Sequence, residues 1–117
     1  MTTTVTLYQS TDASAPVLTG AVGSLVALLD ACLMNGYGTK AGAGWTIVYT
    51  GTNQRVYKMS TTSGTGNSLF VDDSATVSGS TPEEAYLTGF EAPTGLGTGT
   101  GQFPTSAQCA LVFNCTS

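Results

Sequence analysis

The chain has 117 residues and a net charge of -4, with 41% hydrophobic and only 9% charged residues. This length fits one domain with one hydrophobic core. Three Lys and Arg residues in total are too few for the clustered positive charge of a nucleic-acid interface, so no nucleic-acid partner is expected. No apolar run is long enough to span a membrane, and residues 1–4 lack the basic region and apolar core of a signal peptide. A membrane partner is therefore not expected either.

The low charge content distinguishes this sequence from an average soluble domain, in which about a quarter of the residues are charged. Ser, Thr and Gly supply the polarity instead. A surface with few long charged side chains loses little side-chain entropy and little charge solvation when another protein covers it. We therefore expect a surface suited to oligomer or lattice contacts, with a secreted Ser/Thr-rich domain as the alternative.

The first predicted element is a strand at Thr4–Gln9. Its β-branched residues, and the alternation of Val5 and Leu7 with polar residues, indicate an extended segment with one apolar side. A polar loop, which Pro16 closes, then leads toward the predicted helix.

The predicted helix begins at Ser24, a good N-cap residue, and ends at Asn35-Gly36, which tolerate the left-handed conformation that closes a helix. Asp30 is the one charged residue between them. An ordinary surface helix has a polar back. This helix has almost none, so we expect it to lie within a core or between a sheet and a neighbouring subunit. Its apolar face is made by Leu25, Leu28, Leu29, Cys32 and Leu33, and Val26 extends it.

A hairpin is predicted next, in which Trp45–Thr50 and Arg55–Met59 pair across a turn that contains Gly and Asn. Strict alternation along the first strand would place Trp45, Ile47 and Tyr49 on one face.

The third strand of this region, Leu69–Asp72, has apolar residues on both faces and is predicted to be central in its sheet. Two segments rich in Gly, Ser and Thr, near 60–67 and 94–104, are predicted to be flexible loops. The pattern indicates a single domain over residues 1–117 with an α+β fold: a mainly antiparallel sheet of about six short strands with one apolar helix packed on a face. A β-sandwich is the alternative. The remaining predicted strands are Ala85–Phe90 and Ala110–Phe113.

The chain contains no His, which removes the commonest general base and metal ligand. Its three cysteines, Cys32, Cys109 and Cys115, are an odd number and argue against a disulfide framework. We expect free thiols made in a reducing cytoplasm; intermolecular disulfides of Cys109 or Cys115 stay open. Cys32 falls in the second half of the helix, away from the N-terminal end that would activate a thiol, so it is interpreted as a small buried residue.

Two pairs of carboxylates, Asp72-Asp73 and Glu83-Glu84, are the remaining candidates for chemistry. Oxygen ligands suit calcium, but the spacing of a calcium loop is absent. A solvated acidic rim is therefore predicted. We expect no enzyme, no cofactor and no metal site.

Several segments, taken in order along most of the chain, resemble a group of tailed-bacteriophage virion structural proteins of poorly defined role. The resemblance implies a non-enzymatic, multicopy component of the head or tail, without catalytic residues. The matching segments are Gly23–Gly38, Ala43–Trp45, Tyr49–Asn53, Val71–Asp73, Leu87–Glu91 and Gly99–Pro104.

Composition and resemblance together predict a capsid- or tail-associated accessory protein, located in the virion, that binds itself and other phage structural proteins. The alternative is a receptor- or glycan-binding module of a tail fibre or surface adhesin, with Trp45, Tyr49 and Tyr57 exposed on one sheet face. Head or tail location, copy number and symmetry stay open. The predicted subunit-interface residues are Leu25, Val26, Leu29, Leu33, Leu96 and Phe103.

Overall fold

The computed structural model describes residues 5–19, 21–62, 64–74, 84–103 and 109–112. One helix begins as α1 (Ser24–Leu29) and continues as a π-helical segment, η1 (Asp30–Asn35). The strands are β1 (Thr46–Gly51), β2 (Gln54–Lys58), β3 (Ser68–Asp72), β4 (Glu84–Phe90), β5 (Ala92–Gly95), β6 (Thr98–Thr100) and β7 (Cys109–Val112).

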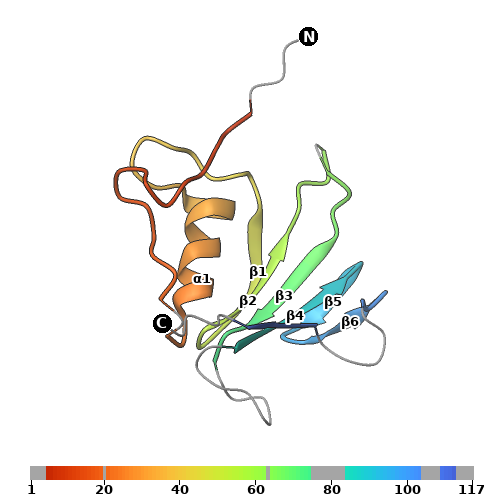
Figure 1. Ribbon diagram of the computed structural model, residues 1–117. Coiled ribbons are helices and arrows are strands. Elements are labelled where there is room, and N and C mark those ends of the chain that lie inside the picture. The colour runs from red at the N-terminus through yellow and green to blue at the C-terminus, as the bar shows by residue number, and fades with distance from the viewer. Residues whose placement is uncertain (1–4, 20, 63, 75–83, 104–108, 113–117) are drawn as a thin grey trace.

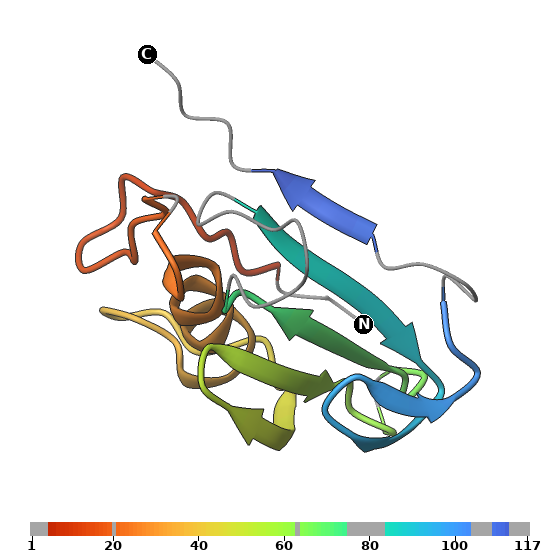
Figure 2. The same cartoon turned by 90° about the horizontal axis from the view of Figure 1, so that it is seen from below.

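Five of these strands form an antiparallel sheet in the order β1-β2-β3-β4-β7, and β5 and β6 form a separate hairpin. The helix covers one side of the sheet, as Figure 1 shows, and Figure 2 shows β7 running beside β4 at the far edge. The α+β prediction is confirmed. None of the described helices has the length and apolar character that a membrane span requires.

The core has two parts because alternate residues of the strands point to opposite faces of the sheet. Buried residues on the helix side form one cluster, and a second cluster lies on the other face. β3 contributes Val71 to the first and Phe70 to the second, so the prediction of a central strand with two apolar faces is confirmed. The first cluster contains Leu25, Val26, Tyr57, Val71 and Ala85; the second contains Val56, Phe70 and Phe90.

The predicted hairpin between β1 and β2 is confirmed, but its first strand does not alternate strictly. The register places Ile47 opposite Tyr57 and Tyr49 opposite Val56, with a bulge between Ile47 and Tyr49. Tyr57 and Val56 are neighbours with opposite orientations, so Tyr49 lies on the face away from Ile47. The prediction that Tyr49 shares a face with Ile47 is wrong, because the extra residue reverses the alternation.

The Gly-rich segment near 94–104 was predicted to be irregular, and this is wrong for the part that forms β5 and β6. The turn at Gly97 has φ +73°, and a Cβ there would lie 3.3 Å from the Phe70 ring. Small residues thus let this hairpin lie close against the second core cluster. The segment near 60–67 connects β2 to β3, and the Met59 N–H donates to the Asn67 carbonyl across its base at 3.0 Å.

The predicted first strand is also wrong: residues 5–9 belong to no helix or strand. Val5 and Leu7 are 84% and 61% exposed, so their alternation faces solvent and covers no core. Residues 5–9 are called the N-terminal arm below. In Figure 1 this arm rises above the helix, away from the sheet.

Candidate functional site

The predicted subunit interface on the helix is largely used inside the domain. Leu25 and Val26 are only 6% and 3% exposed, and Leu29 and Leu33 are partly buried against the same cluster. The prediction is wrong for Leu25 and Val26, and only parts of Leu29 and Leu33 reach the surface. The reason is that the sheet of the same chain covers this face of the helix. The composition of the helix did not determine whether its own sheet or another subunit would cover it.

Leu96 and Phe103, the other two predicted interface residues, are exposed at 36% and 74%. They belong to a wider set of large apolar side chains on the surface. The sequence did not indicate that most of these residues are exposed. The alternation of Val5 and Leu7 with polar residues did indicate one apolar side near the N-terminus. The other members are Val5, Leu7, Val17, Leu18, Val22, Met34, Val48 and Tyr49.

A groove of about 400 Å³ lies between the helix and the segment that precedes it. The groove is lined mainly by apolar atoms. The Cys32 thiol and polar groups of Tyr8 and Tyr37 also belong to the lining. Burial raises the pKa of Cys32, which disfavours the thiolate that nucleophilic chemistry needs. The groove therefore offers mainly apolar contact, and its thiol is not activated as a nucleophile. Its lining residues are Tyr8, Gln9, Ser10, Ala15, Pro16, Val17, Leu18, Leu28, Cys32 and Tyr37.

Asp12 organises the polar cluster at the base of the N-terminal arm. Its Oδ2 lies 2.8 Å from Lys40 Nζ, and it accepts hydrogen bonds from the Tyr37 hydroxyl at 2.6 Å and the Gln9 N–H at 2.9 Å. The hydrogen bond from Lys40, followed by that from Tyr37, lowers the pKa of Asp12 to about 2. The Tyr8 ring lies 5.9 Å from that of Tyr37, centroid to centroid. These contacts attach the base of the arm to the body of the domain.

A second polar cluster joins the helix to β2. The Tyr57 hydroxyl donates to Asp30 Oδ1 at 2.7 Å and to the Val26 carbonyl at 3.2 Å, and Arg55 Nη2 lies 3.3 Å from Asp30 Oδ2. Burial, and then the hydrogen bond to Asp30, raise the pKa of Tyr57 far above its usual value. This explains why the helix carries a single Asp: it receives a buried hydroxyl and a guanidinium from the sheet.

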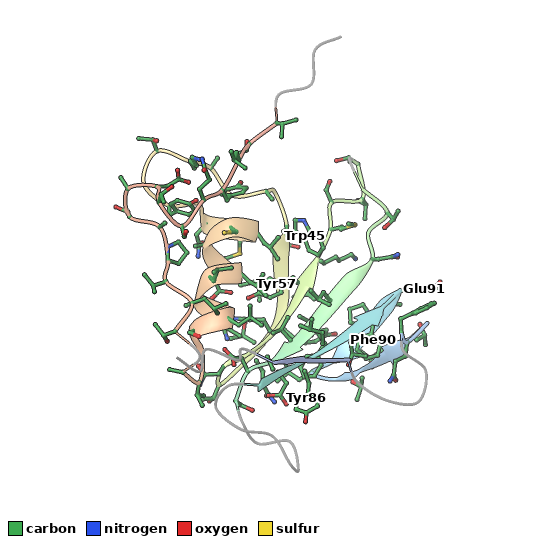
Figure 3. The ribbon with its side chains drawn as sticks, viewed as in Figure 1. Trp45, Tyr57, Tyr86, Phe90 and Glu91 are labelled. Carbon is green, nitrogen blue, oxygen red and sulfur yellow. The ribbon has the colours of Figure 1, made fainter. Side chains whose placement is uncertain are left out.

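The exposed aromatic platform expected of a glycan-binding module is not formed. Tyr57 is fully buried, Trp45 packs against the helix-side cluster, and Tyr49 lies on the opposite face of the sheet. Figure 3 shows Tyr57 between β2 and the helix, with Trp45 at the start of β1.

The predicted solvated acidic rim is wrong for Asp72 and Asp73, which are 5% and 1% exposed. Asp73 Oδ2 accepts the Leu25 N–H at 2.9 Å and the Val26 N–H at 3.5 Å, so it caps the helix. The prediction of Ser24 as the N-cap is wrong as well, since Gly23 occupies that position with φ +86° and no side-chain cap of its own.

Burial is the main cause that raises the pKa of Asp73, against the lowering effect of the backbone N–H groups that it accepts. Asp72 in turn accepts the Ser74 N–H at 3.1 Å. Across the described part of the chain no group of three or more potential metal ligands comes together. Glu83 and the side chain of Glu84 lie outside the described residues, as do Cys115 and the side chain of Cys109.

Comparison of the chain with protein-family models, with curated proteins and with solved structures found no match.

Proposed function

We propose that this protein is a non-enzymatic structural component of a tailed-phage particle, assembled in many copies on the head or the tail. The observation that carries the proposal is the combination of exposed apolar side chains with very few charges. Val5, Val17 and Phe103 are 84%, 72% and 74% exposed, and only 9% of all residues are charged. A covering protein would gain free energy by burying such side chains, and the scarcity of charges lowers the cost of covering the surface around them.

The resemblance of the chain to tailed-phage virion proteins supports the same proposal, and it indicates that the assembly is a phage particle. Two of its segments, Gly23–Gly38 and Tyr49–Asn53, meet in the structure. The Gly23 N–H donates to the Asp73 carbonyl at 3.1 Å, and the Asp73 N–H donates to the Asn53 carbonyl at 3.0 Å. The resembling segments thus include the junction that holds the helix on the sheet.

The polar groups of the described residues also favour a structural role. Asp12, Asp30 and Asp73 each accept hydrogen bonds that attach one element to another. Their partners are backbone N–H groups, buried hydroxyls or cations of the same chain. An active site instead keeps such groups directed at a substrate.

The test is to look for the protein in purified particles of a phage that encodes it, and to measure its mass in solution. Mass spectrometry of particles purified through a density gradient should find it in many copies. Sedimentation velocity of the purified protein should show assembly that increases with concentration. A protein that is monomeric at every concentration and absent from particles would contradict the proposal.

A further inference from the structure

The N-terminal arm has two unlike sides. The Tyr8 side is attached to the domain, because the Tyr8 hydroxyl donates to the Ala41 carbonyl at 2.5 Å and its ring lies beside that of Tyr37. Val5 and Leu7, which alternate with it, are 84% and 61% exposed. The arm is thus fixed at its base while its apolar side faces solvent.

The backbone of the arm is also used on one edge only. The Leu7 carbonyl accepts a hydrogen bond from Lys40 Nζ, and the Gln9 N–H donates to Asp12 and to the Tyr37 hydroxyl. In an extended chain the backbone groups of residues two apart point the same way, so those of Thr6 and Tyr8 point to the opposite edge. Within the described residues, no hydrogen bond reaches the backbone of Thr6 or Tyr8. That edge can therefore accept a strand.

The sheet has a matching free edge at β1. This strand lies at one end of the strand order, so among the described residues no strand neighbours one side of its backbone. Natural edge strands are usually protected by charged side chains, Pro or a bulge. β1 has the bulge after Ile47, but its sequence TIVYTG contains no charge and no Pro. Val48 and Tyr49, at the bulge, are 40% and 37% exposed.

We propose that the N-terminal arm of one copy pairs as an additional strand with the free edge of β1 in a second copy. This inference rests on the proposed structural function and names the contact through which copies assemble. Five extended residues reach about 17 Å and the six of β1 about 20 Å, so the two segments match in length. Neither segment carries a charge, so no like-charge repulsion opposes their pairing.

Each copy offers one arm and one edge, and the two are different surfaces. The contact is therefore heterologous and generates rings or open filaments. Such an arrangement suits a protein that is present in many copies on a particle.

The first test disables each partner separately. Leu7→Lys places a charge on the arm and Val48→Lys places one on the edge; each should weaken self-association about tenfold or more, since pairing would bury an ammonium group. Val22→Lys makes the same change at an exposed site outside both segments and outside the groove, and it should leave self-association unchanged. Sedimentation velocity over a concentration series measures all three variants.

A second pair of variants distinguishes backbone hydrogen bonding between strands from non-specific hydrophobic association. Thr6→Pro removes the N–H of the free arm edge and should reduce self-association, whereas Thr6→Val keeps that N–H and should not. Thr6 lies outside every helix and strand, so both variants should fold. Thermal unfolding verifies that they do.

The decisive experiment mixes the two disabled proteins. Leu7→Lys retains a working edge and Val48→Lys retains a working arm, so a mixture should form a heterodimer at concentrations at which neither variant associates with itself. No heterodimer in the mixture would overturn the inference, as would loss of assembly in the Val22→Lys control. If the unmodified protein never associates, the proposed function fails; if it associates and the arm and edge variants do so equally well, only this inference fails.

Discussion

Asp73 gives the sharpest test of how the helix is held on the sheet. The perturbation is Asp73→Ala, which deletes a carboxylate that is 1% exposed and accepts the N–H groups of Leu25 and Val26. Loss of an N-terminal cap costs about 1–2 kcal/mol, and a buried donor left without a partner costs about 1–3 kcal/mol. Because both N–H groups are buried, we expect a loss of free energy of unfolding of about 2–3 kcal/mol.

Urea denaturation followed by circular dichroism measures this loss, and thermal melting should show a fall on the order of 10 °C for a domain of this size. Asp73→Asn is the matched variant, because its amide oxygen can still accept from Leu25. It also removes a charge whose burial is unfavourable, so we expect it to lose less than about 1 kcal/mol. If Asp73→Ala were as stable as the unmodified protein, the carboxylate would not be the cap.

The pH dependence of stability, compared between the unmodified protein and Asp73→Asn, tests the effect of the Asp73 charge. The pKa of Asp73 is raised above its ordinary value of 3.8, so the folded state binds a proton at pH values where the unfolded state has lost it. The contribution of Asp73 to the free energy of unfolding is therefore largest below pH 3.8 and is lost as the pH rises through the folded pKa. The stability difference between the unmodified protein and Asp73→Asn should fall as the pH increases above about 4. A difference that grows with pH would refute this reasoning.

The remaining predictions concern three further contacts. Tyr57→Phe removes the hydroxyl that donates to Asp30 and should lower the free energy of unfolding by about 1.5–3 kcal/mol, measured by urea denaturation; an unchanged midpoint would contradict it. Gly23→Ala should cost more than Gly44→Ala in the same measurement. Both glycines have positive φ, but a Cβ at Gly23 would lie 2.6 Å from Asn53 Oδ1 whereas the same atom at Gly44 meets nothing within 4 Å. Equal losses of free energy of unfolding would show that the backbone strain of a positive φ decides the cost and that the contact with Asn53 does not add to it. Asp12 should titrate with a pKa of about 2 by NMR, so its stabilising effect, present above pH 3.8, should disappear as the pH falls through 2; a value near 3.8 would mean that the Lys40 contact is not formed in solution.

The sequence predicted the elements whose signals lie within a few neighbouring residues. The helix between Ser24 and Asn35, the hairpin of β1 and β2 and the central β3 were all found in this way. Apolar periodicity and turn residues act locally, and one helix with several short strands admits few arrangements other than a sheet with a helix on it. The α+β fold class follows from these features alone.

The prediction failed where a residue depends on a partner far along the chain. Asp73 caps the helix by accepting the N–H of Leu25, which lies 48 residues before it, and this replaces Ser24 as the source of the cap. The Gly-rich segment forms β5 and β6 because it lies against the core residues Phe70 and Phe90, where a side chain at Gly97 or Gly99 would be crowded. Neither contact leaves a periodic signal in the sequence.

For the candidate interface, too, some features followed from composition and others depended on the tertiary structure. Composition by itself determined that the surface has few charges and that the helix is apolar on nearly all sides. Tertiary structure alone decided that Leu25 and Val26 face the sheet of their own chain, while Val5 and Leu7 remain outside it. The physical reason is that hydrophobicity is a property of each residue, whereas burial depends on which distant element arrives to cover it.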